Sequence, residues 1–356
     1  MTNPDFGRRL ERLMSSVGTV EVLITDPEDI RWLTGFTGSN GWVLATTGGT
    51  LLVTDGRYVD QAAAQCSAAG TRVELARGRD EMIRIVADHS VGPIGFQDDR
   101  VTVALHRDIA ATISGLEPVG ARLLDLRRCK DRSEIDTLTR AARIADRALN
   151  ACSASITPGR TEREIRDDLE AAMRRFGADG PSYETIVATG TVNSARPHHR
   201  PTDEIVREGD SLVIDVGALV QGYHSDMTRT FLLGPVDPEL DAWWDLVRHA
   251  QEEGCRAVGP GVPAREVDEA CRRVFRTAGV EDRFVHGTGH GVGLLIHEEP
   301  FLGRTSEAIL ASGDVVTVEP GLYRDGLGGV RIEDLLVVTD DGFVRLTGSD
   351  KTRSPQ

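Results

Sequence analysis

Four acidic residues in the second half of the chain are placed where a buried cluster of carboxylates would form. Asp215 and Glu319 each end a run of apolar and β-branched residues, and Asp226 and Glu333 follow them after a turn. Each turn makes the two members of its pair neighbours across a hairpin. Burial of an unpaired carboxylate is costly, and a like charge beside it adds to the cost. About two divalent cations would neutralise the four groups, as in two-metal hydrolases.

The alternative is that these acids are neutralised locally by other side chains or by backbone donors. Arg229 and Arg331 lie close to the acids in sequence and are the candidates for such pairing. For one acid alone this alternative would be favoured, but four acids at paired spacings favour a metal site.

Histidines near the acids strengthen the case for a site. Only nine occur in the chain, and five of them fall in two short segments: His198, His199, His286, His290 and His297. A single histidine is usually an ordinary surface or core residue, whereas a cluster is typical of a site. The glycines around His290 do not complete a dinucleotide-binding fingerprint, and no Walker A, HExxH or GxSxG sequence is present.

A degenerate repeat predicts the elements that position these residues. Six positions match at one constant offset: Pro158-Gly159, Arg163-Glu164-Ile165 and Gly177 match Pro260-Gly261, Arg265-Glu266-Val267 and Gly279. Thr161 and Glu164 have the spacing of a capping box, and Gly177 lies where a left-handed C-cap belongs, so a helix between them is predicted. A duplicated unit usually builds its site between the copies.

Each copy is followed by a pair of strands that carries two of the acids. The predicted strands are Ser211–Leu219 and Ser225–Leu233 around a turn at Gln221-Gly222, and Val315–Glu319 and Val330–Val338 around a turn at Asp325-Gly326. Upstream, short apolar runs alternate with helix-like stretches from Val20 to Leu126, which predicts a small α/β domain. The charged stretch Arg127–Ser133 precedes a helical pattern, so we expect domains at residues 1–127 and 128–356.

The overall composition restricts the classes of partner. A net charge of −15 without a run of basic residues argues against nucleic acid. The first thirty residues contain no signal-peptide core, and no membrane span is predicted anywhere. Five cysteines without CxxC spacing suggest neither a disulfide framework nor a structural zinc site. These features favour the reducing cytoplasm.

At this point the residues resemble the metallopeptidases of the pita-bread fold, most closely aminopeptidase P and prolidase. Five motifs carry the resemblance: Asp215-Val-Gly, Ser-Asp226-Met-Thr-Arg-Thr, Gly-Thr-Gly-His290-Gly, Val-Glu319-Pro-Gly and Val-Arg-Ile-Glu333-Asp. The segments Ile30–Gly41 and Thr54–Tyr58 are similar to the creatinase/prolidase-like N-terminal domain of these enzymes. One departure is Ala188-Thr-Gly-Thr-Val-Asn193, where the family more often has Ala-Ser-Gly-Pro-Asn.

The resemblance implies an α+β protein in which a small N-terminal α/β domain precedes pseudo-symmetric αβ halves around a curved antiparallel sheet. It implies five metal ligands, namely Asp215, Asp226, His290, Glu319 and Glu333. It further implies that Glu319 moves a proton, that His198 and His297 stabilise the oxyanion, and that His286 and Arg331 bind or orient the substrate. Two divalent ions, manganese before cobalt or zinc, would activate water to cleave the bond before proline. A homodimer acting on proline-containing peptides is implied.

Two other functions stay open at this stage. The same scaffold could hydrolyse a C–N bond in a small non-peptide substrate, as in creatinase-like or ectoine-hydrolase-like enzymes, because fold does not determine function. A non-catalytic binding module is the more remote alternative, since such a protein would be expected to have lost part of the ligand set. Whether dipeptides or longer peptides are preferred is not decided by these motifs.

Overall fold

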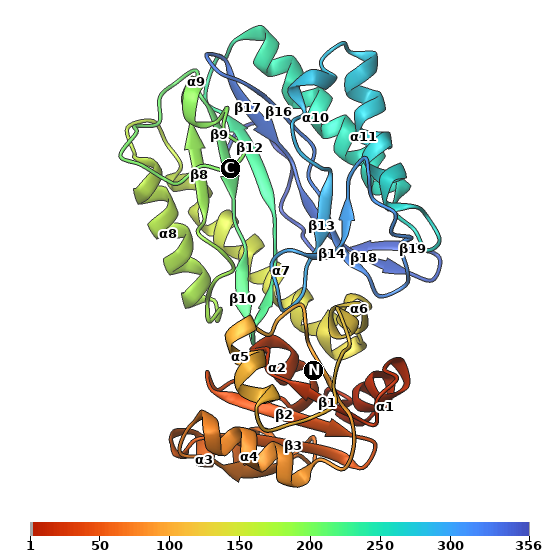
Figure 1. Ribbon diagram of the computed structural model, residues 1–356. Helices are drawn as coiled ribbons and strands as arrows, with labels where there is room; N and C mark the ends of the chain where they lie inside the picture. The colour runs from red at the N-terminus through yellow and green to blue at the C-terminus, as the bar shows by residue number, and fades with distance from the viewer. Residues whose placement is uncertain (1–2, 356) are drawn as a thin grey trace. The chain divides into compact units, whose positions relative to one another are not determined.

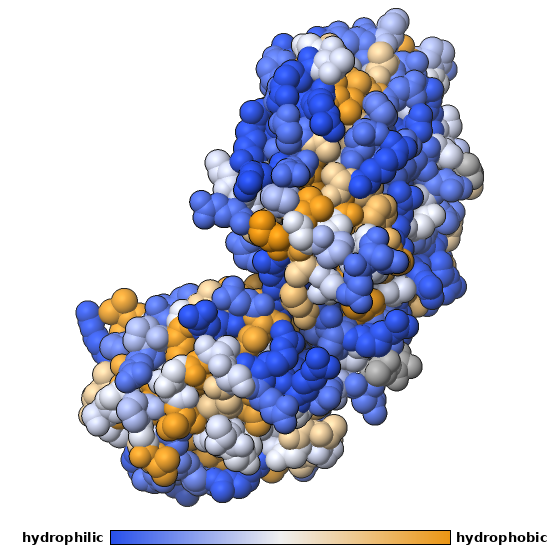
Figure 2. Space-filling model, turned by 90° about the vertical axis from the view of Figure 1, so that its right-hand side faces the viewer, coloured by the Kyte–Doolittle hydropathy of each residue, from blue (hydrophilic) through white to orange (hydrophobic). Residues whose placement is uncertain are grey.

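The computed structural model describes residues 3–355 and divides into two compact units, residues 3–127 and the residues from Arg128 onward. Within the described part of the chain, no helix is long and apolar enough to cross a membrane. The face of the molecule in Figure 2 is mostly hydrophilic, with hydrophobic residues in small groups.

The N-terminal unit is built on one six-stranded mixed sheet with the strand order β4-β3-β2-β1-β5-β6. The strands are β1 (Glu21–Ile24), β2 (Gly41–Thr46), β3 (Gly49–Thr54), β4 (Arg72–Leu75), β5 (Ile94–Phe96) and β6 (Leu116–Pro118). The helices are α1 (Phe6–Ser16), α2 (Pro27–Thr34), α3 (Val59–Gln65), α4 (Arg79–His89), α5 (Val103–Ala110) and α6 (Arg122–Arg128). The α/β character expected for Val20–Leu126 is therefore confirmed.

The second unit consists of two similar halves followed by a C-terminal hairpin strand. The first half contains α7 (Arg132–Cys152), α8 (Glu162–Arg175), β7 (Gly180–Pro181), β8 (Ile186–Thr189), α9 (Gly190–Asn193), β9 (Ser211–Asp215), β10 (Ala218–Val220), β11 (Tyr223–His224) and β12 (Thr228–Leu232). The second half contains α10 (Pro238–Ala257), α11 (Ala264–Thr277), β13 (Gly289–Gly291), β14 (Glu298–Leu302), β15 (Val315–Val318), β16 (Gly321–Arg324), β17 (Gly328–Arg331) and β18 (Asp334–Thr339). Strand β19 (Gly342–Arg345) pairs with β18.

The two halves bury their helices against their own strands, as Figure 1 shows with α7 and α8 on one side and α10 and α11 on the other. One apolar core lies between α7, α8 and the strands around β9, and a second lies between α10, α11 and the strands around β15. The sheet orders β12-β9-β8 and β14-β13-β15-β18-β19 place β9 and β15 at corresponding positions. This arrangement confirms the α+β class with duplicated halves.

The helix predicted from the first copy of the repeat is present with its predicted ends. Thr161 and Glu164 form a reciprocal capping box at the start of α8. Gly177, just beyond the end of the helix, has a φ of +100°, a backbone conformation that glycine adopts without a steric cost. The corresponding α11 has Pro263 at its N-cap and no side-chain cap.

Two of the four strands predicted to carry the acids were wrong in one respect, because each of the two is interrupted at or beside an acid. Strand β9 ends at Asp215, and the chain resumes as β10 only after Gly217. A Cβ on Gly217 would lie 1.9 Å from the carbonyl oxygen of Ser225, so the close approach of these two segments requires glycine. The predicted strand Val330–Val338 is likewise divided into β17 and β18 on either side of Ile332-Glu333.

Candidate metal centre

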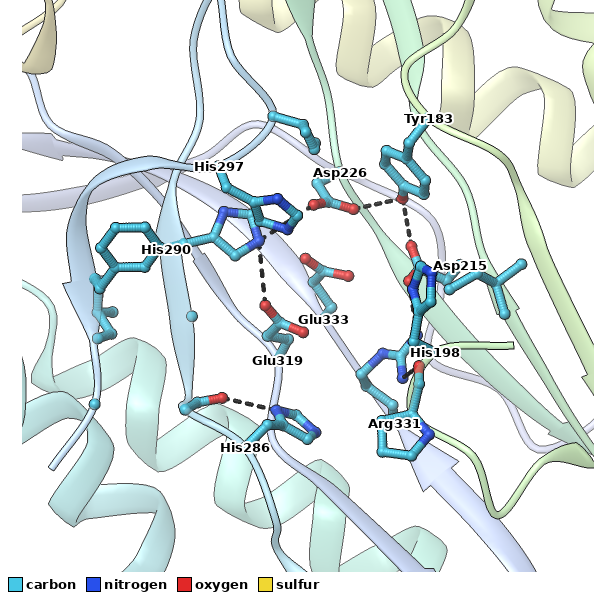
Figure 3. A pocket seen from close by; sticks show the side chains of 18 of the residues that line it. Tyr183, His198, Asp215, Asp226, His286, His290, His297, Glu319, Arg331 and Glu333 are labelled. Atoms are coloured by element: carbon cyan, nitrogen blue, oxygen red, sulfur yellow. Dashed lines mark hydrogen bonds and ion pairs between the residues drawn. The ribbon is translucent and has the colours of Figure 1, made fainter. Parts of the chain in front are cut away.

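The predicted site residues line one cavity of about 400 Å³ within the second unit. Figure 3 shows their side chains converging from strands of both halves. The cavity walls also contain apolar side chains, including Ile186, Ile296 and Leu302. Pockets that combine apolar walls with a few convergent polar groups are typical of ligand sites.

Three of the four predicted acids bring their oxygen atoms together. One carboxylate oxygen from each of Asp215, Asp226 and Glu333 lies within 4.8 Å of the other two. The fourth acid, Glu319, joins the group through a histidine: the Nε2 atom of His290 lies 3.4 Å from Glu319 and 3.6 Å from Asp226. All five predicted metal ligands thus lie at one place, and both halves of the unit contribute to it.

The electrostatics of the cluster fit a bound cation. Burial, together with the neighbouring carboxylates, raises the pKa of Asp226 and that of Glu333 well above their usual values. One oxygen of Glu333 accepts a hydrogen bond from Thr228, whereas its other oxygen, Oε1, is buried without a hydrogen-bond partner among the described residues. A divalent cation would satisfy this oxygen and neutralise the repulsion between the acids.

The alternative of local pairing with arginine accounts for only part of the cluster. Arg331 does donate to Asp215, at 2.6 Å between Nη2 and Oδ2. Arg229, the other candidate, donates instead to Asp334 and to backbone carbonyl oxygens. The carboxylates of Asp226 and Glu333 have no arginine partner among the described residues, so their charge still requires compensation.

Tyr183 is a site residue that the sequence reasoning missed. Its hydroxyl contacts Asp215 and lies 2.5 Å from Asp226. A hydroxyl has one proton to donate, so Tyr183 donates to only one of these two carboxylates at a time. Tyr183 lies three residues before β8, and the register Ile186↔Asp215 between β8 and β9 places it beside the acids.

Arg331, Tyr323 and His286 form a hydrogen-bonded chain that leads away from Asp215. The Nδ1 atom of His286 lies 2.8 Å from the carbonyl oxygen of Gly287, which can only accept, so Nδ1 carries the proton. Nε2 then accepts from the Tyr323 hydroxyl at 3.0 Å, and that oxygen accepts from Arg331 at 3.0 Å. Burial and the nearby Arg331 lower the pKa of His286 to about 4. Both ring nitrogens of His286 are therefore engaged within the protein.

His198 and His297 lie at the exposed side of the same cavity. The ring of His297 packs edge-on against the ring of His290, with centroids 4.4 Å apart. Burial and the proximity of His290 lower the pKa of His297. Figure 3 shows His297 beside His290 and His198 near Asp215 and Arg331, on opposite sides of the acidic cluster.

The segment that carries His198 is anchored by Glu162, the first residue of α8. The Glu162 carboxylate is completely buried and accepts five hydrogen bonds from residues 189–202. Its Oε1 atom accepts from Thr189 N and Asn193 Nδ2, and its Oε2 atom from His199 Nε2, Thr202 N and Thr202 Oγ1. His199 is thus a structural partner of Glu162 and does not line the cavity, unlike its neighbour His198.

Comparison with known proteins gives the family. The model of metallopeptidase family M24 matches residues 136–340, which is more than half of the chain. This protein belongs to metallopeptidase family M24. The model of the creatinase/prolidase N-terminal domain matches residues 8–129. Members of family M24 use divalent metal ions, and the acidic cluster is compatible with such a centre.

Solved structures match the chain over both of its units. A structure described as Xaa-Pro dipeptidase from Bacillus anthracis is 36% identical, covers 98% of this chain and 99% of that chain, and has a TM-score of 0.93. A structure of X-Pro aminopeptidase from Thermotoga maritima is 33% identical, with coverage of 97% and 99% and a TM-score of 0.89. An uncharacterized peptidase of Bacillus subtilis, YqhT, is 36% identical over 349 residues, which are 96% of this chain and 98% of that protein.

Proposed function

We propose that this M24 enzyme hydrolyses the peptide bond between an N-terminal residue and a following proline. The observation that carries the proposal is the convergence of five potential ligands, from both halves of the second unit, in a cavity that also contains His198, His286 and His297. Related proteins described as Xaa-Pro dipeptidases and X-Pro aminopeptidases, matched over nearly the whole chain, support the same bond specificity.

In this proposal Asp215, Asp226, His290, Glu319 and Glu333 hold two divalent ions. When bound, such ions supply Lewis-acid chemistry and lower the pKa of a water molecule toward neutrality. The donor set, four carboxylates and one imidazole, favours manganese, with cobalt or zinc as alternatives. Tyr183 and Arg331 hold Asp215 in place by direct hydrogen bonds, so the ligand cannot turn away from the cluster.

The remaining side chains supply proton transfer and charge stabilisation. Glu319 would accept a proton from the attacking water and pass it to the leaving proline nitrogen. His198 and His297 would donate hydrogen bonds to the oxyanion from the exposed side of the cavity, and one good donor contributes about 3–4 kcal/mol. His286, whose nitrogens are occupied, would contact the substrate through its ring and keep Arg331 in position through Tyr323.

The decisive experiment offers the manganese-loaded protein three peptides in equal amounts: an Xaa-Pro dipeptide, an Xaa-Pro-Yaa-Yaa tetrapeptide and a tetrapeptide with alanine in place of proline. Products are identified by mass spectrometry. Cleavage before proline, with the alanine peptide left intact, is expected. Cleavage of the dipeptide alone would identify a prolidase, and release of the first residue from the tetrapeptide an aminopeptidase P. Absence of cleavage with two ions bound would refute the proposal and favour a small non-peptide C–N substrate.

We further propose that the protein is a homodimer located in the cytoplasm. It is supported by the resemblance to prolidases and aminopeptidase P and by a cysteine pattern without disulfide or zinc spacing. Light scattering coupled to size-exclusion chromatography measures the mass directly, and a value equal to one 38.6 kDa chain would contradict the dimer.

A further inference from the structure

A buried polar network lies directly behind two of the candidate ligands. Its centre is Asp334, which follows Glu333 in the chain and is completely buried. Three cationic side chains surround its carboxylate: Arg229 at 2.9 Å, Lys351 at 2.7 Å and Arg345 at 3.0 Å. One buried carboxylate with three cationic partners is an unusual concentration of charge, because each buried ion has a desolvation cost.

The side chain of Gln251, on α10, connects Asp334 to β15, the strand that directly precedes the candidate ligand Glu319. Its Nε2 atom donates to Asp334 at 3.0 Å and lies 3.4 Å from the carbonyl oxygen of Val318, the residue before Glu319. Its Oε1 atom accepts from Lys351 at 2.6 Å. One buried amide therefore bonds to residues adjacent in sequence to both Glu319 and Glu333.

Arg229 extends the network to the first half of the unit. Its guanidinium donates to the carbonyl oxygens of Glu333 and Thr228, and the Thr228 hydroxyl donates to the Glu333 carboxylate at 2.7 Å. The backbone and the side chain of Glu333 are thus held from β12 while Asp334 is held from α10. Rotation of the Glu333 side chain away from the cluster would break its hydrogen bond from Thr228.

Lys351 reaches this position because the C-terminal segment is fastened at several points. Leu346 N donates to Leu335 O at 2.8 Å, and Ser349 N donates to Asp146 at 2.8 Å. Farther on, Arg353 O accepts from Leu232 N at 2.6 Å. The Lys351 side chain is only 13% exposed. The ammonium group therefore occupies one defined place.

We propose that Gln251 and Lys351 are positioning residues for the metal centre, acting on Glu319 and Glu333 through Val318 and Asp334. This inference rests on the proposed function, because it assigns these residues to the geometry of the same metal site. Outer-shell partners that orient ligands typically change metal affinity about 10–100-fold when they are mutated. A role in folding alone would instead change the stability of the metal-free protein and leave the affinity intact.

The test compares Lys351→Met and Gln251→Met with Arg353→Gln in the full-length protein. Arg353 belongs to the same segment, but its side chain pairs with Asp241 and Asp245 and does not touch Asp334, so its variant is the matched control. Calorimetric titration of Mn²⁺ into the metal-free proteins measures affinity and stoichiometry, and thermal unfolding of the same samples measures stability. We expect a roughly 10–100-fold weaker affinity in both methionine variants and no change in the control.

Each result decides the inference. Wild-type affinity in both methionine variants, with or without a lower unfolding temperature, would overturn it, as would an equal loss in the control. If Lys351→Met does not fold, Gln251→Met decides alone. A wild-type protein that binds no Mn²⁺, Co²⁺ or Zn²⁺ would overturn the proposed function and this inference with it, whereas two ions bound equally by all variants would overturn this inference only.

Discussion

The substitution Glu162→Gln tests whether one buried carboxylate holds the segment that carries His198. Glutamine has the shape of glutamate, but it places an NH₂ group where one carboxylate oxygen was. All five groups around Glu162 donate hydrogen bonds, two to Oε1 and three to Oε2. The new NH₂ group must therefore face donors in either orientation.

The loss of stability is smaller when the new NH₂ group takes the position of Oε1 than when it takes that of Oε2. Asn193 can turn its amide oxygen toward the new donor, but the backbone N–H of Thr189 loses its acceptor, and an unsatisfied buried donor costs about 1–3 kcal/mol. The three bonds to the other oxygen lose the assistance of the negative charge, and relief of burying that charge offsets part of this loss. We expect a net destabilisation of about 2–4 kcal/mol, or roughly 5–12 °C for a unit of this size.

Differential scanning calorimetry of the metal-loaded protein measures the shift, and mass spectrometry of metals and peptide turnover are measured on the same sample. Glu170→Gln is the control, because Glu170 lies on the same helix, and its ion pair within the described part of the chain is with the largely exposed Arg174, at 3.7 Å. Turnover should fall because His198 is displaced, while two ions remain bound. An unfolding temperature within about 2 °C of wild type would refute the role assigned to Glu162.

Three further substitutions test the site itself. Asp226→Asn should abolish both metal loading and turnover, and retention of either, in metal analysis or a peptide assay, would contradict its assignment as a ligand. Tyr183→Phe should weaken Mn²⁺ binding about 10–100-fold in calorimetry, since it removes the hydroxyl that contacts two acids. The pKa of His286 is about 4 in the folded protein and about 6.5 when unfolded, so the unfolded state binds its proton first. His286 should therefore lower the stability of the wild type by up to about 3 kcal/mol as pH drops from 6.5 to 4, and the difference between wild type and His286→Gln in urea unfolding across that range measures this contribution.

The clustering of the four acids could be predicted because each adjoins a run of apolar residues, whereas the full set of five ligands, with His290, was implied by the resemblance to the pita-bread metallopeptidases. An acid at the end of an apolar run, such as Asp215 after Leu212-Val-Ile214, conflicts with its surroundings, and that conflict is visible in sequence. The reciprocal cap of α8 was predicted for a similar reason, since Thr161 and Glu164 interact locally. Local interactions of this kind depend on spacing alone.

The residues that were missed depend on contacts distant in sequence. Tyr183 reaches the acids only because β8 pairs with β9, and Gln251 reaches Asp334 across 83 residues. Neither position carries a periodic signal of its own. The breaks in the predicted strands were missed because strand propensity continues through Val216 and Ile332, whereas the fold needs a bend there to direct the acids into the cavity.

The distribution of the candidate ligands over both halves has a consequence for kinetics. Asp215 and Asp226 come from the first half, and His290, Glu319 and Glu333 from the second, so no half alone contains the complete set. The ions can therefore be held fully only after the halves have docked, which is a late event for contacts so distant in sequence. Interactions absent from the transition state slow unfolding and leave the folding rate almost unchanged. Bound metal should thus slow the unfolding of the native protein and prolong its lifetime, without increasing the rate at which it folds.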